Sequence, residues 1–355
     1  MFDVNAHIHT PYSFSAFESV EEAVEHAAEE GVKVVGINDF YSMDGYGEWK
    51  EGCAARGLYP LFGIEFISLN AEDQAAGLRV NDPNNPGRTY ISGKGLAYPV
   101  ILKGEPLRKL EAVRAESNRQ VEQMCAKLNE WLKAEGKPVQ LDFNEIREKL
   151  TKGSIRERHL AKVLRMALER CPVGAGHDAV IPGLTGDLSP AKVENELRSK
   201  LLKAGGPAFV PESPEAFLPM ITVQDIIEAA GGIPTYPFLA DDAKGNFTDF
   251  EGDLMKAADT LKKRGFRSVE FITTRNTTAV LEQYAGYLED EGFIVSFGSE
   301  HNTPAMEPVK LRTRDAVELS ETLKAINWRG ACAIAAHQAG LDSVAAGEDL
   351  IMQTV

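Results

Sequence analysis

The sequence is poor in cysteine and lacks a long apolar run. Its four cysteines (Cys53, Cys125, Cys171 and Cys332) are scattered along 355 residues, with no Cys-x-x-Cys pair among them. This spacing excludes a dense disulfide framework and is typical of reduced thiols inside a cell. No apolar stretch approaches the length that spans a bilayer, and the first residues (MFDVNAHIHT) include neither a basic segment nor a long apolar one. We therefore expect a cytoplasmic protein.

Positive charge is also scarce. The chain has 38 lysines and arginines against 53 aspartates and glutamates, a formal net charge of -15 at pH 7. Nucleic acid and anionic membranes would be repelled by this charge, so neither is expected as a partner. An anionic small molecule would need a local basic pocket.

Short apolar segments alternate with helical patterns in the first and last thirds of the chain. Strands are predicted over 2–6, 32–39, 58–69, 233–238, 266–273 and 292–300. Ser19 and Glu22 form a capping box after the first strand, Gly31 ends that helix, and Thr222 is expected to cap a later one. Repeated strand and helix units predict a (β/α) barrel with its active site at the carboxyl ends of the strands.

The middle third is helical in pattern. Apolar residues recur at steps of three and four between residues 105 and 136, and further helices are expected over 142–150, 154–170 and 190–203. We interpret 105–210 as a helical insertion that divides the barrel into a first part, 1–104, and a second part with closing helices, 211–355.

Polar residues stand where several of these strands end. His7 and His9 follow the first strand, Glu65 lies within an apolar strand, and Glu300 ends the last one. Residues two apart in an extended chain share a face, so both histidines can reach one ion, and the two carboxylates would complete a site suited to zinc, manganese or iron. The alternatives are a pair of partly exposed loop histidines and an ion pair between Glu65 and a lysine or arginine.

Seven segments in order resemble the motifs of the PHP (polymerase and histidinol phosphatase) family. They are HIHTPYS, GVKVVGINDF, LFGIEF, GRTYISGKG, RERHLAKVL, GGIPTYPF and GFIVSFGSEHNTP, which cover the barrel over about 1–100 and 220–305. The resemblance implies an α/β fold, a distorted (β/α)7 PHP-like barrel with a helical insertion. It also implies a metal-dependent phosphoesterase, although the family's domain occurs in bacterial replicative polymerases as well.

The family's metal ligands are only partly present. The first site would have His7, His9, the bridging Glu65, and Glu300 where an aspartate is usual, with His301 as a fifth ligand or a supporting or surface histidine. At the second site Tyr90 and Tyr236 stand where the resemblance expects histidines. A tyrosine ligates only as phenolate, whose unperturbed pKa of about 10 makes that unfavourable.

The third site has lost all its expected ligands, since those positions hold Phe14, Phe40 and Asn302. Phenylalanine has no lone pair for a cation. We therefore expect one divalent ion in a reduced site.

The same resemblance assigns residues to the substrate. Arg158 and His159 match the family's RPHIA segment, and Arg275 is a further candidate contact for phosphate. Asp39, Glu65 and His159 are the candidate catalytic groups, Asp39 as a general base. Tyr90 and Tyr236 either donate hydrogen bonds to the substrate or are ordinary core tyrosines.

Three functions remain open on these residues. The first is hydrolysis of a small phosphorylated substrate with the help of one metal ion. The second is a binding protein on the same barrel that keeps an ion without turnover. The third is hydrolysis of a C–N bond, since fold alone does not fix the chemistry.

Overall fold

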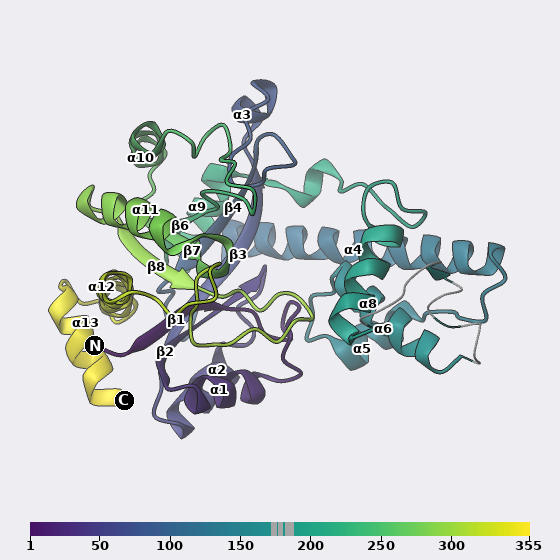
Figure 1. The fold of residues 1–355 in the computed structure, drawn as a ribbon, viewed down its shortest axis with the longest axis horizontal. Coiled ribbons are helices and arrows are strands. Elements are labelled where there is room, and N and C mark those ends of the chain that lie inside the picture. The colour runs from purple at the N-terminus through teal and green to yellow at the C-terminus, as the bar shows by residue number, and fades with distance from the viewer. Residues whose placement is uncertain (172–175, 177–179, 182–187) are drawn as a thin grey trace.

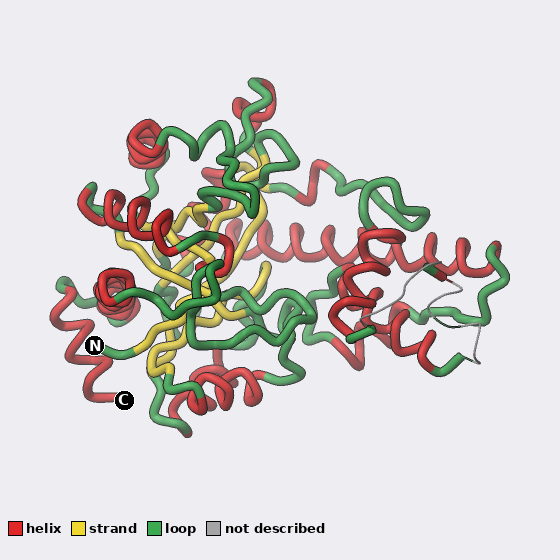
Figure 2. The backbone as a smooth tube through the Cα atoms, in the orientation of Figure 1, coloured by secondary structure: helices red, strands yellow, loops and turns green. Residues whose placement is uncertain are grey.

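The structure is a computed structural model that describes residues 1–171, 176, 180–181 and 188–355. Figure 1 shows a barrel-shaped sheet surrounded by helices on one side of the molecule and a helical unit on the other, joined by the long helix α4. Figure 2 shows that all the strands gather in the barrel. No helix among the described residues is both long enough and apolar enough to cross a membrane.

Seven strands follow one another around the sheet in the order β1-β2-β3-β4-β6-β7-β8. Their bounds are β1 Asp3–Ile8, β2 Val32–Phe40, β3 Tyr59–Leu69, β4 Arg88–Lys94, β6 Ile233–Phe238, β7 Ser268–Ile272 and β8 Ile294–Gly298, and the two-residue β5 (Leu218–Pro219) pairs with β3. Beyond β8, Glu300 pairs with Ile8, and the His9 backbone N–H donates to the Glu300 carbonyl at 2.7 Å. The sheet is thus nearly closed, which confirms the predicted barrel.

One strand breaks the parallel pattern. β4 runs antiparallel to both β3 and β6, whereas the β1–β2, β2–β3, β6–β7 and β7–β8 pairs are parallel. In the register of β3 and β4, Glu65 lies opposite Ser92. This pairing brings the polar residues of β4 to the strand that carries Glu65.

Helices cover the outside of the barrel. They are α1 Val20–Glu29, α2 Tyr46–Ala55, α3 Ala71–Ala75, α9 Met220–Ala229, α10 Leu254–Lys263, α11 Thr278–Asp290, α12 Glu321–Gln338 and α13 Val344–Thr354. Half of the predicted capping box of α1 is present: the Ser19 side chain accepts from the Glu22 N–H, but the Glu22 carboxylate accepts from the Glu18 N–H instead of the Ser19 N–H. The expected cap at Thr222 is wrong: α9 begins at Met220, directly after Pro219, and Thr222 lies inside the helix.

The helical insertion has a hydrophobic core of its own. It contains α4 Gly104–Ala134, α5 Phe143–Leu150, α6 Glu157–Glu169, α8 Pro190–Leu197 and the π-helical turn Arg198–Leu202, and a 3-10 turn, Pro214–Ala216, leads back to the barrel. The first half of α4 packs on the barrel through Leu110 and Val113, and its second half packs on α5 and α6 through residues such as Leu128. The insertion is therefore anchored to the barrel by one continuous helix.

Candidate metal centre and substrate cavity

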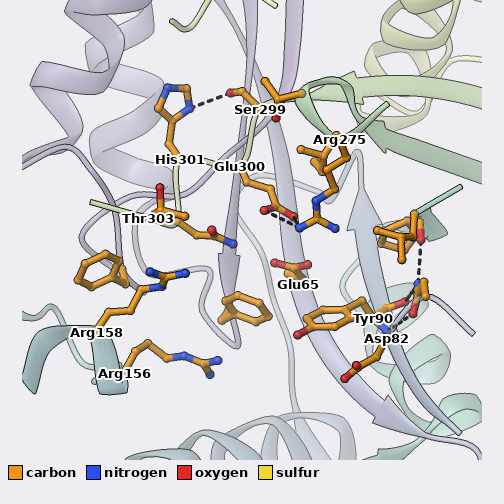
Figure 3. Close-up of a pocket in the computed structure, with 18 of the residues that line it drawn as sticks. Glu65, Asp82, Tyr90, Arg156, Arg158, Arg275, Ser299, Glu300, His301 and Thr303 are labelled. Carbon is orange, nitrogen blue, oxygen red and sulfur yellow. Dashed lines mark hydrogen bonds and ion pairs between the residues drawn. The ribbon is translucent and has the colours of Figure 1, made fainter. Parts of the chain in front are cut away.

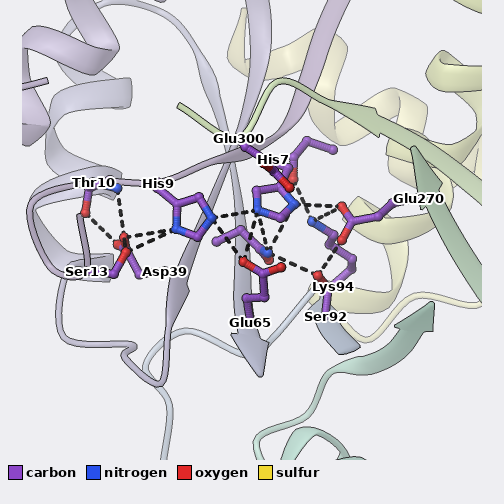
Figure 4. A network of polar contacts seen from close by, with 12 residues as sticks. His7, His9, Thr10, Ser13, Asp39, Glu65, Ser92, Lys94, Glu270 and Glu300 are labelled. Carbon is purple, nitrogen blue, oxygen red and sulfur yellow. Dashed lines mark hydrogen bonds and ion pairs between the residues drawn. The ribbon is translucent and has the colours of Figure 1, made fainter. Parts of the chain in front are cut away.

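Three side chains converge at the carboxyl end of β1. His7 and His9 lie at the end of this strand, and Glu65 extends from β3 (Figure 4). The Nε2 atoms of the histidines are 3.1 Å apart, and the Glu65 Oε2 atom lies 3.0 Å from His9 Nε2 and 3.7 Å from His7 Nε2. Both histidines are 0% exposed and Glu65 is 2% exposed. The spacing permits all three atoms to contact one ion.

The hydrogen bonds around His9 fix which ring nitrogen carries the proton. The Ser13 hydroxyl donates its only hydrogen to Asp39 Oδ1 at 2.6 Å, and the His9 Nδ1 atom lies 3.1 Å from the Ser13 oxygen. His9 Nδ1 must then be the donor to Ser13. The lone pair of His9 Nε2 consequently points at Glu65 and His7.

Glu270 fixes which ring nitrogen of His7 carries the proton. The Nδ1 atom of this residue lies 3.0 Å from Oε2 of Glu270, a β7 residue that is 0% exposed. Glu270 also accepts from the Ser92 hydroxyl and forms a 2.7 Å ion pair with Lys94. Although burial opposes ionisation, Lys94 and His7 hold the pKa of Glu270 well below its usual range, so it is an acceptor only. His7 therefore donates from Nδ1 and has its lone pair at Nε2, where the Asn38 amide nitrogen also lies at 3.1 Å.

The donor set fits a cation. Two imidazole lone pairs and a carboxylate oxygen face one another, and Glu65 Oε2 is buried with no hydrogen-bond partner among the described side chains. Burial raises the pKa of Glu65 to about 8 and lowers that of His9 to about 4, so the contact between them is not a charged pair at neutral pH. A proton or a metal ion must occupy the space between these atoms. Two nitrogens and one oxygen are typical ligands of zinc, manganese and iron.

The expected fourth ligand, Glu300, is bound elsewhere. Its carboxylate accepts two hydrogen bonds from Arg275, at 2.7 and 2.9 Å, and it does not belong to the group of converging ligand atoms. Glu300 and His301 both have positive φ, at 68° and 56°, which bends the chain directly after β8. Burial opposes ionisation of Glu300, but Arg275 lowers its pKa. Glu300 thus lies beside the three ligands and is held as a carboxylate.

Two further predicted residues have their polar atoms occupied. His301 Nδ1 lies 2.7 Å from the Ser299 hydroxyl and Nε2 lies 2.8 Å from the Glu307 carbonyl, and Figure 3 shows the ring pointing away from Glu65. The Tyr236 hydroxyl donates to Glu251 at 2.7 Å in the core, and Tyr236 does not line the cavity described next. The structure does not bring either residue to the converging ligands.

Asp39 is not open to a substrate either. It accepts hydrogen bonds from the Thr10 N–H, the Thr10 hydroxyl and the Ser13 hydroxyl, at 2.8, 2.5 and 2.6 Å. Asp39 is 1% exposed and does not line the cavity. Its geometry suits a residue that orients the His9 loop better than a general base.

A cavity of about 540 Å³ opens above Glu65, between the barrel and the insertion (Figure 3). Four arginines line it: Arg156, Arg158, Arg198 and Arg275. Arg198 is paired with Glu157 at 2.9 Å, and Arg275 is paired with Glu300. Among the described residues, Arg156 and Arg158 have no carboxylate within 4 Å, and burial with the nearby Arg198 lowers the pKa of Arg158 only to about 10. The cavity therefore contains two guanidinium groups that form no ion pair, although Glu157 is near enough to favour the charged form of both.

The guanidinium groups of these two arginines lie over phenylalanine rings. The Arg156 guanidinium lies 4.6 Å from the ring centroid of Phe40, and that of Arg158 lies 5.8 Å from Phe14. Phe40 in turn stacks on His9, with the ring centroids 5.1 Å apart. His159 is a buried neighbour of this group: its Nδ1 accepts from the Arg156 N–H at 3.0 Å, and it does not line the cavity. Tyr90 does line the cavity, as predicted for a substrate contact.

Sequence reasoning missed four residues of this site: Ser92, Lys94, Arg156 and Glu270. Two signals could have indicated three of them, whereas Arg156 has none. Glu270 is a lone acid in the apolar segment SVEFI, the same signal that identified Glu65. Ser92 and Lys94 alternate with Tyr90 along RTYISGK, so all three belong to one face of a strand.

Comparison with known proteins agrees with this geometry. A family model described as the PHP domain matches residues 5–164. The fold is similar to an amidohydrolase from Chromobacterium violaceum, solved with bound sulfate and no metal, at 17% identity and a TM-score of 0.60, covering 91% of this chain and 96% of that one. It is also similar to a proposed metal-dependent phosphoesterase from Bifidobacterium adolescentis, at 16% identity and a TM-score of 0.61, covering 91% and 94%. Among curated proteins, none is similar enough in sequence to match.

Proposed function

We propose that this chain, whose residues 5–164 match the PHP domain, is a metal-dependent hydrolase that cleaves a phosphate ester with the help of one divalent ion. The observation that carries the proposal is the cavity itself. Glu65, one of the three converging ligands, lines it together with Arg156 and Arg158, while the other two ligands, His7 and His9, are fully buried next to Glu65. Such a cavity favours a substrate that has an anionic group next to the bond to be broken.

Three protein ligands would leave coordination positions of a bound ion open, which is typical of catalytic rather than structural sites. A divalent ion held there supplies Lewis acidity next to the reacting bond. Arg156, Arg158 and Arg275 would bind and orient the phosphoryl oxygens. The pKa of Tyr90 is raised by burial, so its hydroxyl stays protonated and is available as a hydrogen-bond donor.

The partner we propose is a phosphorylated small molecule. The net charge of -15 disfavours long polyanions, whereas Arg156 and Arg158, which form no ion pair, offer local contacts for a small anion inside the cavity. The four cysteines are free thiols and three of them are buried, which is compatible with work in the cytoplasm.

The test combines metal content with turnover. Protein depleted of metal with a chelator is reloaded with Zn²⁺, Mn²⁺ or Fe²⁺, and hydrolysis of p-nitrophenyl phosphate and bis(p-nitrophenyl) phosphate is followed. We expect turnover that needs about one ion per chain and is lost in His9→Ala. Hydrolysis of an anilide in preference to both phosphates would support C–N chemistry instead. Equal rates in the wild type and His9→Ala would refute the site.

One observation favours a second candidate, ligand binding without turnover. Asp39 is fully hydrogen-bonded, and Glu300 is paired with Arg275. Neither of these carboxylates is therefore free to act as a base at the cavity. Metal binding and phosphate binding with no hydrolysis of any of the three substrates would support this candidate.

A further inference from the structure

A second cavity, of about 470 Å³, adjoins the first at the junction of barrel and insertion. Both cavities are lined by Asp82, Asn84, Tyr90, Arg156, Glu157 and Arg198. Because six residues belong to both linings, the two cavities lie side by side, and the pair is called the cleft below. Arg156 lies at the junction, whereas Arg158 and Glu65 belong to the first cavity only.

The two parts of the cleft differ in charge. In the second cavity every basic side chain other than Arg156 has a carboxylate partner: Arg88 pairs with Glu212 at 2.9 Å, and Glu157 holds both Arg198 and Lys203, at 2.9 and 3.2 Å. The Arg88 guanidinium also lies over the Phe217 ring, 4.4 Å from its centroid. Positive charge that forms no ion pair is thus confined to the end of the cleft near Arg156 and Arg158.

Part of the second cavity's lining forms an apolar wall, although polar and charged side chains such as Gln120, Lys203 and Glu212 outnumber the apolar ones. Val121 and Met124 from α4 line it, together with Leu202 and Phe209 of the insertion and Phe217. Binding sites for organic groups combine such apolar surface with a few polar contacts, and volumes of about 300–1,000 Å³ suit ligands of drug size. A short phosphorylated metabolite would fill the first cavity and leave this wall uncovered.

We propose that the second cavity is a specificity site for the bulky, uncharged body of the substrate, whose phosphate lies in the first cavity at Arg156 and Arg158. The substrate class is then a phosphate ester of a large organic group with apolar or aromatic surface. This inference rests on the proposed function, because it takes the anionic end of the cleft to be the site of the phosphate. It narrows the substrate from any small phosphate ester to one that reaches past Arg156.

The test uses two phosphonates, which bind without being hydrolysed. Methylphosphonate reaches only the anion site, and 1-naphthylphosphonate adds an aromatic body. Both are titrated by calorimetry into the wild type and into Ala204→Trp, since Ala204 is an exposed residue that lines the second cavity, so that an indole there narrows it without disturbing the core. The matched control is Ala134→Trp, an equally exposed alanine at the end of α4 that lines neither cavity.

We expect the naphthyl compound to bind the wild type at least about tenfold more tightly than methylphosphonate, because its rings cover apolar surface. Ala204→Trp should remove this gain and leave the Kd of methylphosphonate within about twofold, while Ala134→Trp should keep the gain. Unchanged melting temperatures would show that both variants fold.

The remaining outcomes distinguish failure of the second site from failure of the anion site or of catalysis. Equal affinity of the two phosphonates in the wild type overturns the second site but leaves the anion site intact. A gain that survives in Ala204→Trp places the body elsewhere and also overturns the proposal. If neither phosphonate binds, both this inference and the proposed phosphoesterase fail. If the naphthyl gain is present and Ala204→Trp abolishes it, but no ester is hydrolysed, the specificity site stands and only catalysis is refuted.

Discussion

Removing the acceptor that holds the Nδ1 proton of His7 should weaken metal binding without removing any metal ligand. The acceptor is Glu270 Oε2, 3.0 Å from His7 Nδ1 in a fully buried environment. Substitution of Glu270 alone would leave the Lys94 ammonium unpaired at 2% exposure, which costs about 3–5 kcal/mol and risks unfolding. The two residues should therefore be replaced together, as Lys94→Met with Glu270→Leu, a change that exchanges a buried ion pair for apolar side chains.

The expected loss follows from the geometry. Without an acceptor at Nδ1, the proton of His7 is free to move to Nε2, the atom that faces His9 and Glu65. A metal ion can then bind only after the His7 proton has returned from Nε2 to Nδ1, and the cost of this shift weakens metal binding. Loss of such a supporting acceptor typically lowers metal affinity by about 10–100-fold, which corresponds to about 1.4–2.7 kcal/mol.

The matched control is Lys94→Met with Glu270→Gln, which removes the same charges but keeps an oxygen that can accept from His7 Nδ1. Zn²⁺ affinity of both double variants is measured by competition with a fluorescent chelator. Long-range ¹H–¹⁵N NMR spectra of the metal-free proteins report directly which imidazole nitrogen carries the proton. We expect the wild type and the glutamine variant to have His7 protonated at Nδ1.

The reasoning would be refuted in two ways. One is a wild-type spectrum in which His7 is protonated at Nε2. The other is a folded leucine variant that binds Zn²⁺ as tightly as the glutamine control. The NMR result does not depend on turnover, so it stands whether or not the protein is a phosphoesterase.

Three further predictions concern the metal, the anion site and pH. His9→Ala should lower the metal content from about one ion per chain to near zero by elemental analysis, and an unchanged content would remove His9 from the site. Phosphate should raise the melting temperature of the wild type, and Arg158→Ala should need about tenfold more phosphate for the same rise. Lys162→Ala, on the same helix but outside the cavity, serves as the control. Burial lowers the pKa of His159 to about 3 from 6.5, so below pH 6.5 the unfolded chain binds a proton that the folded chain does not, and stability falls as the pH drops towards 3. His159→Asn should flatten this slope by up to about 1.4 kcal/mol per pH unit in urea unfolding, and an unchanged slope would contradict the low pKa.

The sequence predicts the barrel and the three converging ligands because both depend on local patterns. An alternation of apolar and helical segments identifies the strands, and an acid in a buried strand marks Glu65. The antiparallel direction of β4 has no such signal, since RTYISGK alternates equally well in either direction. Without that direction, the meeting of Lys94 and Ser92 with Glu270 is not predictable.

The bend after β8 could not be predicted from the sequence either. Glu300 and His301 adopt positive φ although neither is glycine, so no residue type announces the turn. The turn decides whether the last acid of the barrel faces the histidines or Arg275. Its place at the end of the last strand predicts Glu300 as a fourth ligand, whereas the observed backbone directs its carboxylate to the Arg275 guanidinium at 2.7 Å.

The two phenylalanines have a physical consequence that goes beyond the loss of ligands. The resemblance expects metal-binding side chains at Phe14 and Phe40, and these are the rings over which Arg158 and Arg156 lie. A guanidinium over an aromatic face keeps its charge and its five N–H donors while its position is fixed by the ring. Fixed guanidinium groups therefore supply positive charge beside His9 at positions where additional ions would otherwise need ligands. Under the proposed function, the two phenylalanines and the two arginines are parts of one arrangement, in which the guanidinium groups balance charge on an anionic substrate.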